Sequence, residues 1–209
     1  MGMTFTDRTD AGTQLAHALK ERSIDGDVVC AIPRGGLPLG RQVADSLNRP
    51  LDVVVATKIG APHNPEYAIG AVASDGSLWL NDEAIESLGV DDAYIDSKTE
   101  ELAGAAREKA RRYRDTETLR SFTDQSVILV DDGIATGATV RACLKRLVND
   151  DVARVVLAVP VGSPRSIAAI EADFEAVVCL ETPEAFRAVG QFYDQFEQVS
   201  DERAMSYLD

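Results

Sequence analysis

Two adjacent carboxylates followed by a loop of small residues make residues 127–140, which read VILVDDGIATGATV, the best candidate for a chemical site. Four apolar residues predict a buried strand, Asp131 and Asp132 follow it, and a helix is expected to begin near Gly137. Amides and threonine hydroxyls at such a helix start bind anions, whereas carboxylates bind vicinal hydroxyls or magnesium. The combination predicts a sugar-phosphate site. An ordinary strand–helix turn would explain one acid or one threonine, but not two of each.

A second loop between a predicted strand and a predicted helix carries Arg34, Gly35 and Gly36. The two glycines allow backbone amides to approach an anion closely, and the arginine supplies a bidentate positive charge. Alone, the loop could equally be a plain turn with a surface arginine. Together with residues 131–139 it predicts two separate anion sites.

Apolar strand patterns alternate with helical patterns along the whole chain, which predicts an α/β fold with a mostly parallel sheet. The expected helices cover residues 11–22, 37–47, 91–114, 137–148 and 164–171, and the expected strands cover 28–32, 51–57, 126–130, 154–160 and 176–180. Asp75-Gly76, between residues 68–73 and 77–80, predicts a hairpin.

Composition limits the possible classes of protein. The 209 residues suit one domain, no apolar run approaches the roughly 20 residues of a membrane span, and the first residues lack a secretory signal. Cys30, Cys143 and Cys179 are widely spaced in apolar segments, which indicates reduced thiols in a cytoplasmic protein. A net charge of −14 argues against nucleic-acid binding.

The motif at 127–140 resembles the phosphoribosyl-pyrophosphate (PRPP) motif of type I phosphoribosyltransferases. That resemblance implies a three-layer α/β fold in which helices flank a mostly parallel central sheet, with a small C-terminal hood. It implies one domain over residues 1–209, with a core at about 11–182 and a hood at about 183–209. The implied reaction transfers 5-phosphoribosyl from PRPP to a nitrogenous base and releases pyrophosphate, as in nucleotide salvage or related metabolism.

The resemblance also implies roles for individual residues. PRPP would be bound by residues of the two loops and by a lysine: Arg34, Gly35, Gly36, Lys58, Asp131, Asp132, Ala135, Thr136, Gly137, Ala138 and Thr139. Arg34, Lys58 and the two aspartates would be the catalytic residues. Lys58 is expected to end the second strand and so to project from the carboxyl edge of the sheet. In the family, a residue before the two glycines often has a strained or cis peptide.

Residues 59–70 correspond to the mobile loop that closes over PRPP in the family, with Gly60 and Gly70 as possible hinges. Closure would bring His63, Glu66 and Tyr67 into the site, although a lone loop histidine is more often merely exposed. Magnesium is expected to arrive with PRPP, with Asp131, Asp132 and Asp194 near it.

The accepting base stays open. Val189–Asp194 shares its spacing with 6-oxopurine enzymes, and Phe192, Tyr193 and Val161 are candidate base contacts. However, Ala135 stands where those enzymes carry an acid, and residues 159–162 lack their lysine, so the loop is closer to adenine- and orotate-type enzymes.

The whole chain resembles a group of stand-alone phosphoribosyltransferases without an assigned substrate, whose members are sometimes fused to an α/β-hydrolase domain. The expected partners are PRPP and a nucleobase, without nucleic acid or membrane, and the family usually forms homodimers. The alternative is a regulatory protein that binds PRPP or a nucleotide without transferase activity.

We predict that the protein is adapted to a salt-rich cytoplasm, because 16 arginines stand against five lysines in a chain with net charge −14. Salt should screen the repulsion among its carboxylates, so its melting temperature should rise in molar KCl. Each kcal/mol of added stability corresponds to about 2–4 °C at this chain length. A melting curve that does not move between low salt and molar KCl would contradict this prediction.

Overall fold

The computed structural model describes residues 5–114 and 120–208. Contacts divide the chain into two compact units. The first unit comprises residues 1–53, 122–137 and 152–209, and the second comprises residues 54–121 and 138–151. Residues 183–208, the expected hood, belong to the first unit. The expectation of a single domain stays a prediction.

The first unit is built on a five-stranded parallel sheet with the order β2-β1-β6-β7-β8. Its strands are β1 (Val28–Ala31), β2 (Leu51–Val53), β6 (Ser126–Val130), β7 (Arg154–Val161) and β8 (Ala176–Glu181). Every residue of β1 is buried, and so are the last four of β6. Continuous apolar runs of this kind are typical of parallel strands covered on both faces.

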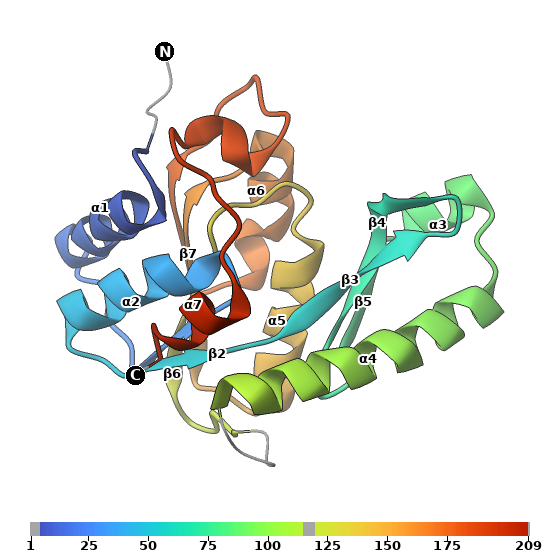
Figure 1. Cartoon of the computed structure of the whole chain (residues 1–209), viewed down its shortest axis with the longest axis horizontal. Coiled ribbons are helices and arrows are strands. Elements are labelled where there is room, and N and C mark those ends of the chain that lie inside the picture. Colours follow the sequence, from blue (N-terminus) through green and yellow to red (C-terminus); the bar gives the residue numbers. More distant parts are fainter. Residues whose placement is uncertain (1–4, 115–119, 209) are drawn as a thin grey trace. The chain divides into compact units, whose positions relative to one another are not determined.

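Helices α1 (Arg8–Glu21) and α2 (Gly36–Leu47) pack on each other and cover the sheet. Leu15 and Leu19 of α1 and Leu39 of α2 share one core with sheet residues such as Ile128. The unit also contains α6 (Pro164–Ile170), α7 (Asp201–Met205) and two short 3-10 turns, η1 (Glu171–Asp173) and η2 (Val189–Phe192). The parallel sheet flanked by helices confirms the predicted fold class (Figure 1).

The second unit contains a three-stranded antiparallel sheet with the order β3-β4-β5. Its elements are β3 (Ala56–Ala61), β4 (Asn64–Ala73), β5 (Leu78–Leu80), α3 (Asp82–Leu88), α4 (Asp92–Arg114) and α5 (Ala138–Asn149). Ala103 of α4 packs against Ile59, Ile69 and Val72, whereas Ala142 of α5 packs near Ala71. The predicted Asp75-Gly76 hairpin is confirmed between β4 and β5.

One expected strand was wrong: the strand expected at 51–57 is divided between β2, in the parallel sheet, and β3, in the antiparallel sheet. Residues 59–70, predicted as a mobile loop, lie largely in the β3–β4 hairpin, and their mobility stays a prediction. A Cβ at Gly60 would come within 2.3 Å of the Pro65 carbonyl oxygen, so close strand approach also favours a glycine there. Helix α3 was not predicted, although Asn81 caps its start and Gly89 ends it in a left-handed conformation.

Within residues 5–114 and 120–208, no helix is long and apolar enough to cross a membrane. The three cysteines are thiols, and Cys30 and Cys143 are buried. The thiols agree with the prediction from the sequence.

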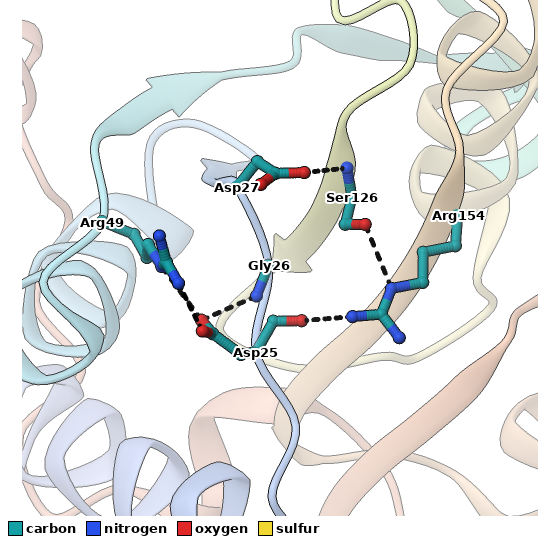
Figure 2. Close-up of polar contacts among 6 residues, drawn as sticks. All are labelled: Asp25, Gly26, Asp27, Arg49, Ser126 and Arg154. Carbon is teal, nitrogen blue, oxygen red and sulfur yellow. Dashed lines mark hydrogen bonds and ion pairs between the residues drawn. The ribbon is translucent and has the colours of Figure 1, made fainter.

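A polar network ties together the amino ends of the parallel strands (Figure 2). Arg49, just before β2, donates both Nε and a terminal nitrogen to the Asp25 carboxylate. Arg154, at the start of β7, donates to the Asp25 carbonyl at 3.0 Å and to the Ser126 hydroxyl at 3.1 Å. Ser126 N–H in turn donates to Asp27 at 2.8 Å. The strand ends are therefore cross-linked at the edge opposite the predicted site.

The hydrogen bond from Arg49 lowers the pKa of Asp25, which makes the network sensitive to acid. A carboxylate with a lowered folded-state pKa contributes stability above the unfolded-state value of about 3.9 and loses it as pH falls through the folded-state pKa. Because the Asp25 side chain is 50% exposed, we expect Asp25→Asn to cost no more than about 1 kcal/mol near pH 7. That difference from wild type should begin to shrink as pH falls below about 4 and should vanish only below the folded-state pKa of Asp25.

Chemical denaturation at several pH values would measure this effect, with Asp96→Asn on the exposed face of α4 as the control. A stability difference for Asp25→Asn that is constant from pH 7 to pH 3 would contradict the prediction.

Candidate active site

The two predicted anion loops leave the same edge of the parallel sheet. Strands β1 and β6 are parallel neighbours, and Ala31 pairs with Val130 at their carboxyl ends. The chain after β1 stays close to β6, because Ile32 N–H donates to the Val130 carbonyl at 2.9 Å. Ligand sites of open α/β sheets lie at the carboxyl ends of the strands.

Close contact between these loops explains the glycine pair. A Cβ at Gly36 would lie 2.7 Å from the Val130 carbonyl oxygen, and a Cβ at Gly35 would lie 2.0 Å from an Asp132 carboxylate oxygen. Any side chain at Gly35 would displace that carboxylate. The Arg34 loop and the acid pair therefore form one contiguous structure.

Arg34 follows a cis peptide bond with Pro33, in agreement with the expectation for this loop. Its guanidinium lies 3.5 Å from the carboxylate of Asp201, the first residue of α7, and the Arg34 side chain is 33% exposed. In Figure 1 the red C-terminal segment lies beside α2, and the Arg34–Asp201 pair joins that segment to the loop that precedes α2. The arginine is thus accessible, but the C-terminal segment already provides it with an anion.

The two aspartates of the acid pair have different surroundings. The Asp131 carboxylate accepts the backbone N–H of Asp132 at 2.9 Å. The Asp132 carboxylate accepts Nε of Arg8 at 2.9 Å, and this ion pair is largely buried, with the side chains 12% and 17% exposed. The hydroxyl of Tyr193 donates to the Asp132 carbonyl at 2.6 Å.

The loop after the acid pair is held to the end of β7 and to α6. Ile134 N–H donates to the Val161 carbonyl, and the hydroxyls of Ser163 and Ser166 donate to the Ala135 carbonyl at 3.1 and 2.6 Å. Gly137 has φ +78°, a left-handed conformation that glycine adopts without strain.

Helix α5 begins at Ala138, so the loop delivers Thr136 and Thr139 to a helix start. The first amides of a helix have no intrahelical acceptor and can bind an anion. Ala135 and Thr136 are exposed, and Thr139 is half-buried.

Lys58 is placed differently from the prediction. It does not end β2 but lies within β3, paired with Ala71 in the antiparallel sheet, and its side chain is exposed. His63, Glu66 and Tyr67 are exposed on the β3–β4 hairpin. His63 and Tyr67 line a cavity of about 390 Å³ within the second unit. Their entry into a closed site stays a prediction.

The candidate base contacts are all buried. Val161 is 0% exposed, Phe192 is 8% exposed and Tyr193 is 6% exposed. Burial, reinforced by the charge of Asp132, raises the pKa of Tyr193, so the phenol stays a hydrogen-bond donor. Stacking of a base on Phe192 or Tyr193 would first require these rings to leave the core, and it stays a prediction.

Asp194 is exposed, and its backbone N–H donates to the Phe5 carbonyl. Among residues 5–114 and 120–208, no three histidines, cysteines, aspartates or glutamates are arranged to hold a metal ion. The acid pair and Asp194 therefore do not form a ready metal cage.

Sequence reasoning missed Arg8, Ser163 and Ser166. The serines had a local signal, because Ser163 followed by Pro164 is a typical helix start and Ser163 does cap α6. Arg8 had none, since it lies 124 residues from the aspartate that it contacts.

The chain matches the family model of the phosphoribosyl transferase domain over residues 7–197. A Mycobacterium tuberculosis protein named "Putative phosphoribosyl transferase" is 41% identical over 205 residues, which cover 98% of this chain and 46% of that protein. This chain thus spans about half the length of the curated relatives that it matches.

Two solved structures extend the comparison. The crystal structure of TT1426 from Thermus thermophilus is 39% identical, covers 99% of this chain and 98% of its own, and has a TM-score of 0.81. A purine phosphoribosyltransferase from Pyrococcus horikoshii shares the fold, with a TM-score of 0.51 at 14% identity and 92% coverage of both chains. With the family model matched over nearly its whole length, the chain belongs to the phosphoribosyl transferase domain family.

Proposed function

We propose that this protein is a PRPP-dependent phosphoribosyltransferase, which transfers 5-phosphoribosyl from PRPP to a nitrogenous base and releases pyrophosphate. The observation that carries the proposal is the contact of the Arg34-Gly35-Gly36 loop with the acid pair at the carboxyl ends of β1 and β6. One loop offers a cation and close backbone approach for a pyrophosphate. The other offers carboxylates for ribose hydroxyls and a helix start for a phosphate.

In the proposed reaction, the bond between C1 of the ribose and the pyrophosphate oxygen breaks, and a base nitrogen forms the new bond to C1. Pyrophosphate leaves with the electron pair, and the ribose passes through a state resembling an oxocarbenium ion. Arg34 and the amides of Gly35 and Gly36 would stabilise the charge that develops on pyrophosphate. Lys58 would join them if the hairpin that carries it approaches the substrate.

The acid pair and the following loop would hold the rest of the substrate. A carboxylate accepts hydrogen bonds from the ribose hydroxyls, and its negative charge favours the cationic ring. Thr136, Gly137, Ala138 and Thr139 would anchor the 5′-phosphate away from the bond that breaks. Magnesium would enter as the counter-ion of PRPP and neutralise charge on its phosphates. Cytoplasmic location and a homodimeric state belong to the proposal as expectations.

The proposal is tested by measuring pyrophosphate release from magnesium-PRPP with a panel of purine, pyrimidine and other nitrogenous bases. We expect one or a few bases to support turnover. The Asp131→Asn, Asp132→Asn double variant should lose at least about 100-fold in turnover, because the groups that bind ribose and face the transition-state charge are neutralised. Thermal unfolding would verify that the double variant is folded.

A fully active double variant would contradict the assignment of the site. PRPP binding by the wild type without turnover of any base would favour the regulatory alternative.

A substitution at Gly35 tests whether the contact between the two loops matters for the reaction. A Cβ at Gly35 would lie 2.0 Å from the Asp132 carboxylate, so Gly35→Ala should shift the loop and reduce kcat/KM by about 10-fold or more. Gly104→Ala in α4 is the matched control, because a Cβ there has no neighbour within 4 Å. The control should keep full activity and unfold at the same or a higher temperature. Equal activities for the two variants would contradict the prediction.

A further inference from the structure

Arg8 provides a buried positive charge beside the acid pair. It is the first residue of α1, and its side chain is 12% exposed. Its Nε donates to the Asp132 carboxylate at 2.9 Å, and one terminal nitrogen donates to the Glu197 carbonyl at 2.7 Å. Its guanidinium carbon lies 3.8 Å from the centre of the Phe196 ring. Three contacts from two distant segments therefore hold the guanidinium in one orientation.

Aromatic residues of the C-terminal segment pack around Arg8 and Asp132. Tyr193 packs against Phe5 and Phe196, with ring centres 5.5 and 4.9 Å apart, and its hydroxyl donates to the Asp132 carbonyl. An arginine stacked on an aromatic ring gains a cation–π interaction and loses little freedom when it binds a carboxylate. Arg8 is thus preorganised for Asp132.

The Asp132 carboxylate is confined from the opposite side as well. It lies where the Cβ of any larger residue at position 35 would be, so it fills the space above the Gly35 backbone. Asp132 thus links α1, the Arg34 loop and the C-terminal segment. The Asp131 carboxylate, by contrast, accepts a hydrogen bond from the next residue of its own loop.

The Arg8–Asp132 ion pair also changes the electrostatic potential beside the acid pair. Two adjacent carboxylates repel each other, and both repel a substrate with several phosphate charges. A cation 2.9 Å from Asp132 compensates one of these charges in a chain whose net charge is −14. Arg8 would thereby lower the repulsion between the acid pair and an anionic substrate.

We propose that Arg8 is a positioning residue that fixes the Asp132 carboxylate and so gives the two aspartates different roles. Arg8 holds the Asp132 carboxylate between the Arg34 loop and the sheet, so Asp132 has a role that Asp131 does not share. The assignment rests on the proposed transferase function, and it treats the two aspartates as unequal.

The test is a double-mutant cycle on the affinity for magnesium-PRPP, measured by calorimetry in the full chain. Arg8→Gln should weaken binding by roughly 10- to 100-fold, as expected for the loss of a hydrogen bond between charged groups. In an Asp132→Asn background the same change should have little further effect, because Arg8 acts through Asp132. In an Asp131→Asn background its effect should persist in full.

Three further variants separate positioning from general stability. Arg8→Lys should recover part of the affinity. Lysine keeps the positive charge, but it lacks the planar guanidinium that binds a carboxylate through several N–H groups and stacks on an aromatic ring. Lys20→Gln, which removes an exposed charge from the same helix, should bind PRPP like the wild type. Phe196→Leu should give an intermediate loss, and it replaces Arg8→Gln in the cycle if Arg8→Gln does not fold.

An Arg8→Gln effect of equal size in both aspartate backgrounds would overturn the inference while leaving the transferase proposal intact. Wild-type affinity for Arg8→Gln would overturn it as well. A wild type that neither binds nor turns over PRPP would refute the proposed function and, with it, the inference that depends on it.

Discussion

The close approach of two backbone loops at the carboxyl ends of β1 and β6 is the constraint on which the site depends. The backbone of Gly36 lies against the Val130 carbonyl, and Gly35 lies against the Asp132 carboxylate, so neither position has room for a side chain. Parallel pairing of β1 with β6 sets this distance. At the opposite ends of the same strands, the N–H of Ser126 in β6 donates to Asp27, just before β1. The sheet therefore fixes the spacing of the loops from both ends.

Charge compensation is the second requirement, because two adjacent carboxylates stand together in a chain whose net charge is −14. The structure places an arginine on each side of the contact between the loops. Arg8 pairs with Asp132, and Arg34 lies near Asp201. Both arginines contact the C-terminal segment, Arg8 through Phe196 and Glu197 and Arg34 through Asp201. That segment consequently forms part of the wall of the site.

Family membership carries more information about the reaction than about the accepting base. In the function proposed here, the two loops would bind PRPP and other side chains would bind the base. Here Val161, Phe192 and Tyr193 are buried in the core. Ala135 is exposed, and its carbonyl is occupied by Ser163 and Ser166. Ser163 and Ser166 thus hold the shape of the loop that follows the acid pair.

Local patterns were sufficient to predict much of this protein. The strand at 126–130, the α/β class and the two loops follow from apolar runs and from glycines, acids and threonines at short spacing, because such signals act over a few residues. The position of Lys58 in the antiparallel sheet could not be predicted from these local patterns. The sequence predicted one strand over residues 51–57, although residues 51–53 pair in the parallel sheet and residues 56 and 57 pair in the antiparallel sheet. Sheet membership is set by distant partners, and periodicity does not record those partners.

Dependence on distant partners also explains why the sequence did not reveal the contact of Arg8 with Asp132 or the different surroundings of the two aspartates. By itself the sequence determined that Asp131 and Asp132 stand side by side after a buried strand. The tertiary structure decided that one of them accepts an arginine from 124 residues away while the other caps its own loop. That choice depends on packing α1 and the C-terminal aromatic rings against the sheet, which brings distant charges within hydrogen-bonding distance.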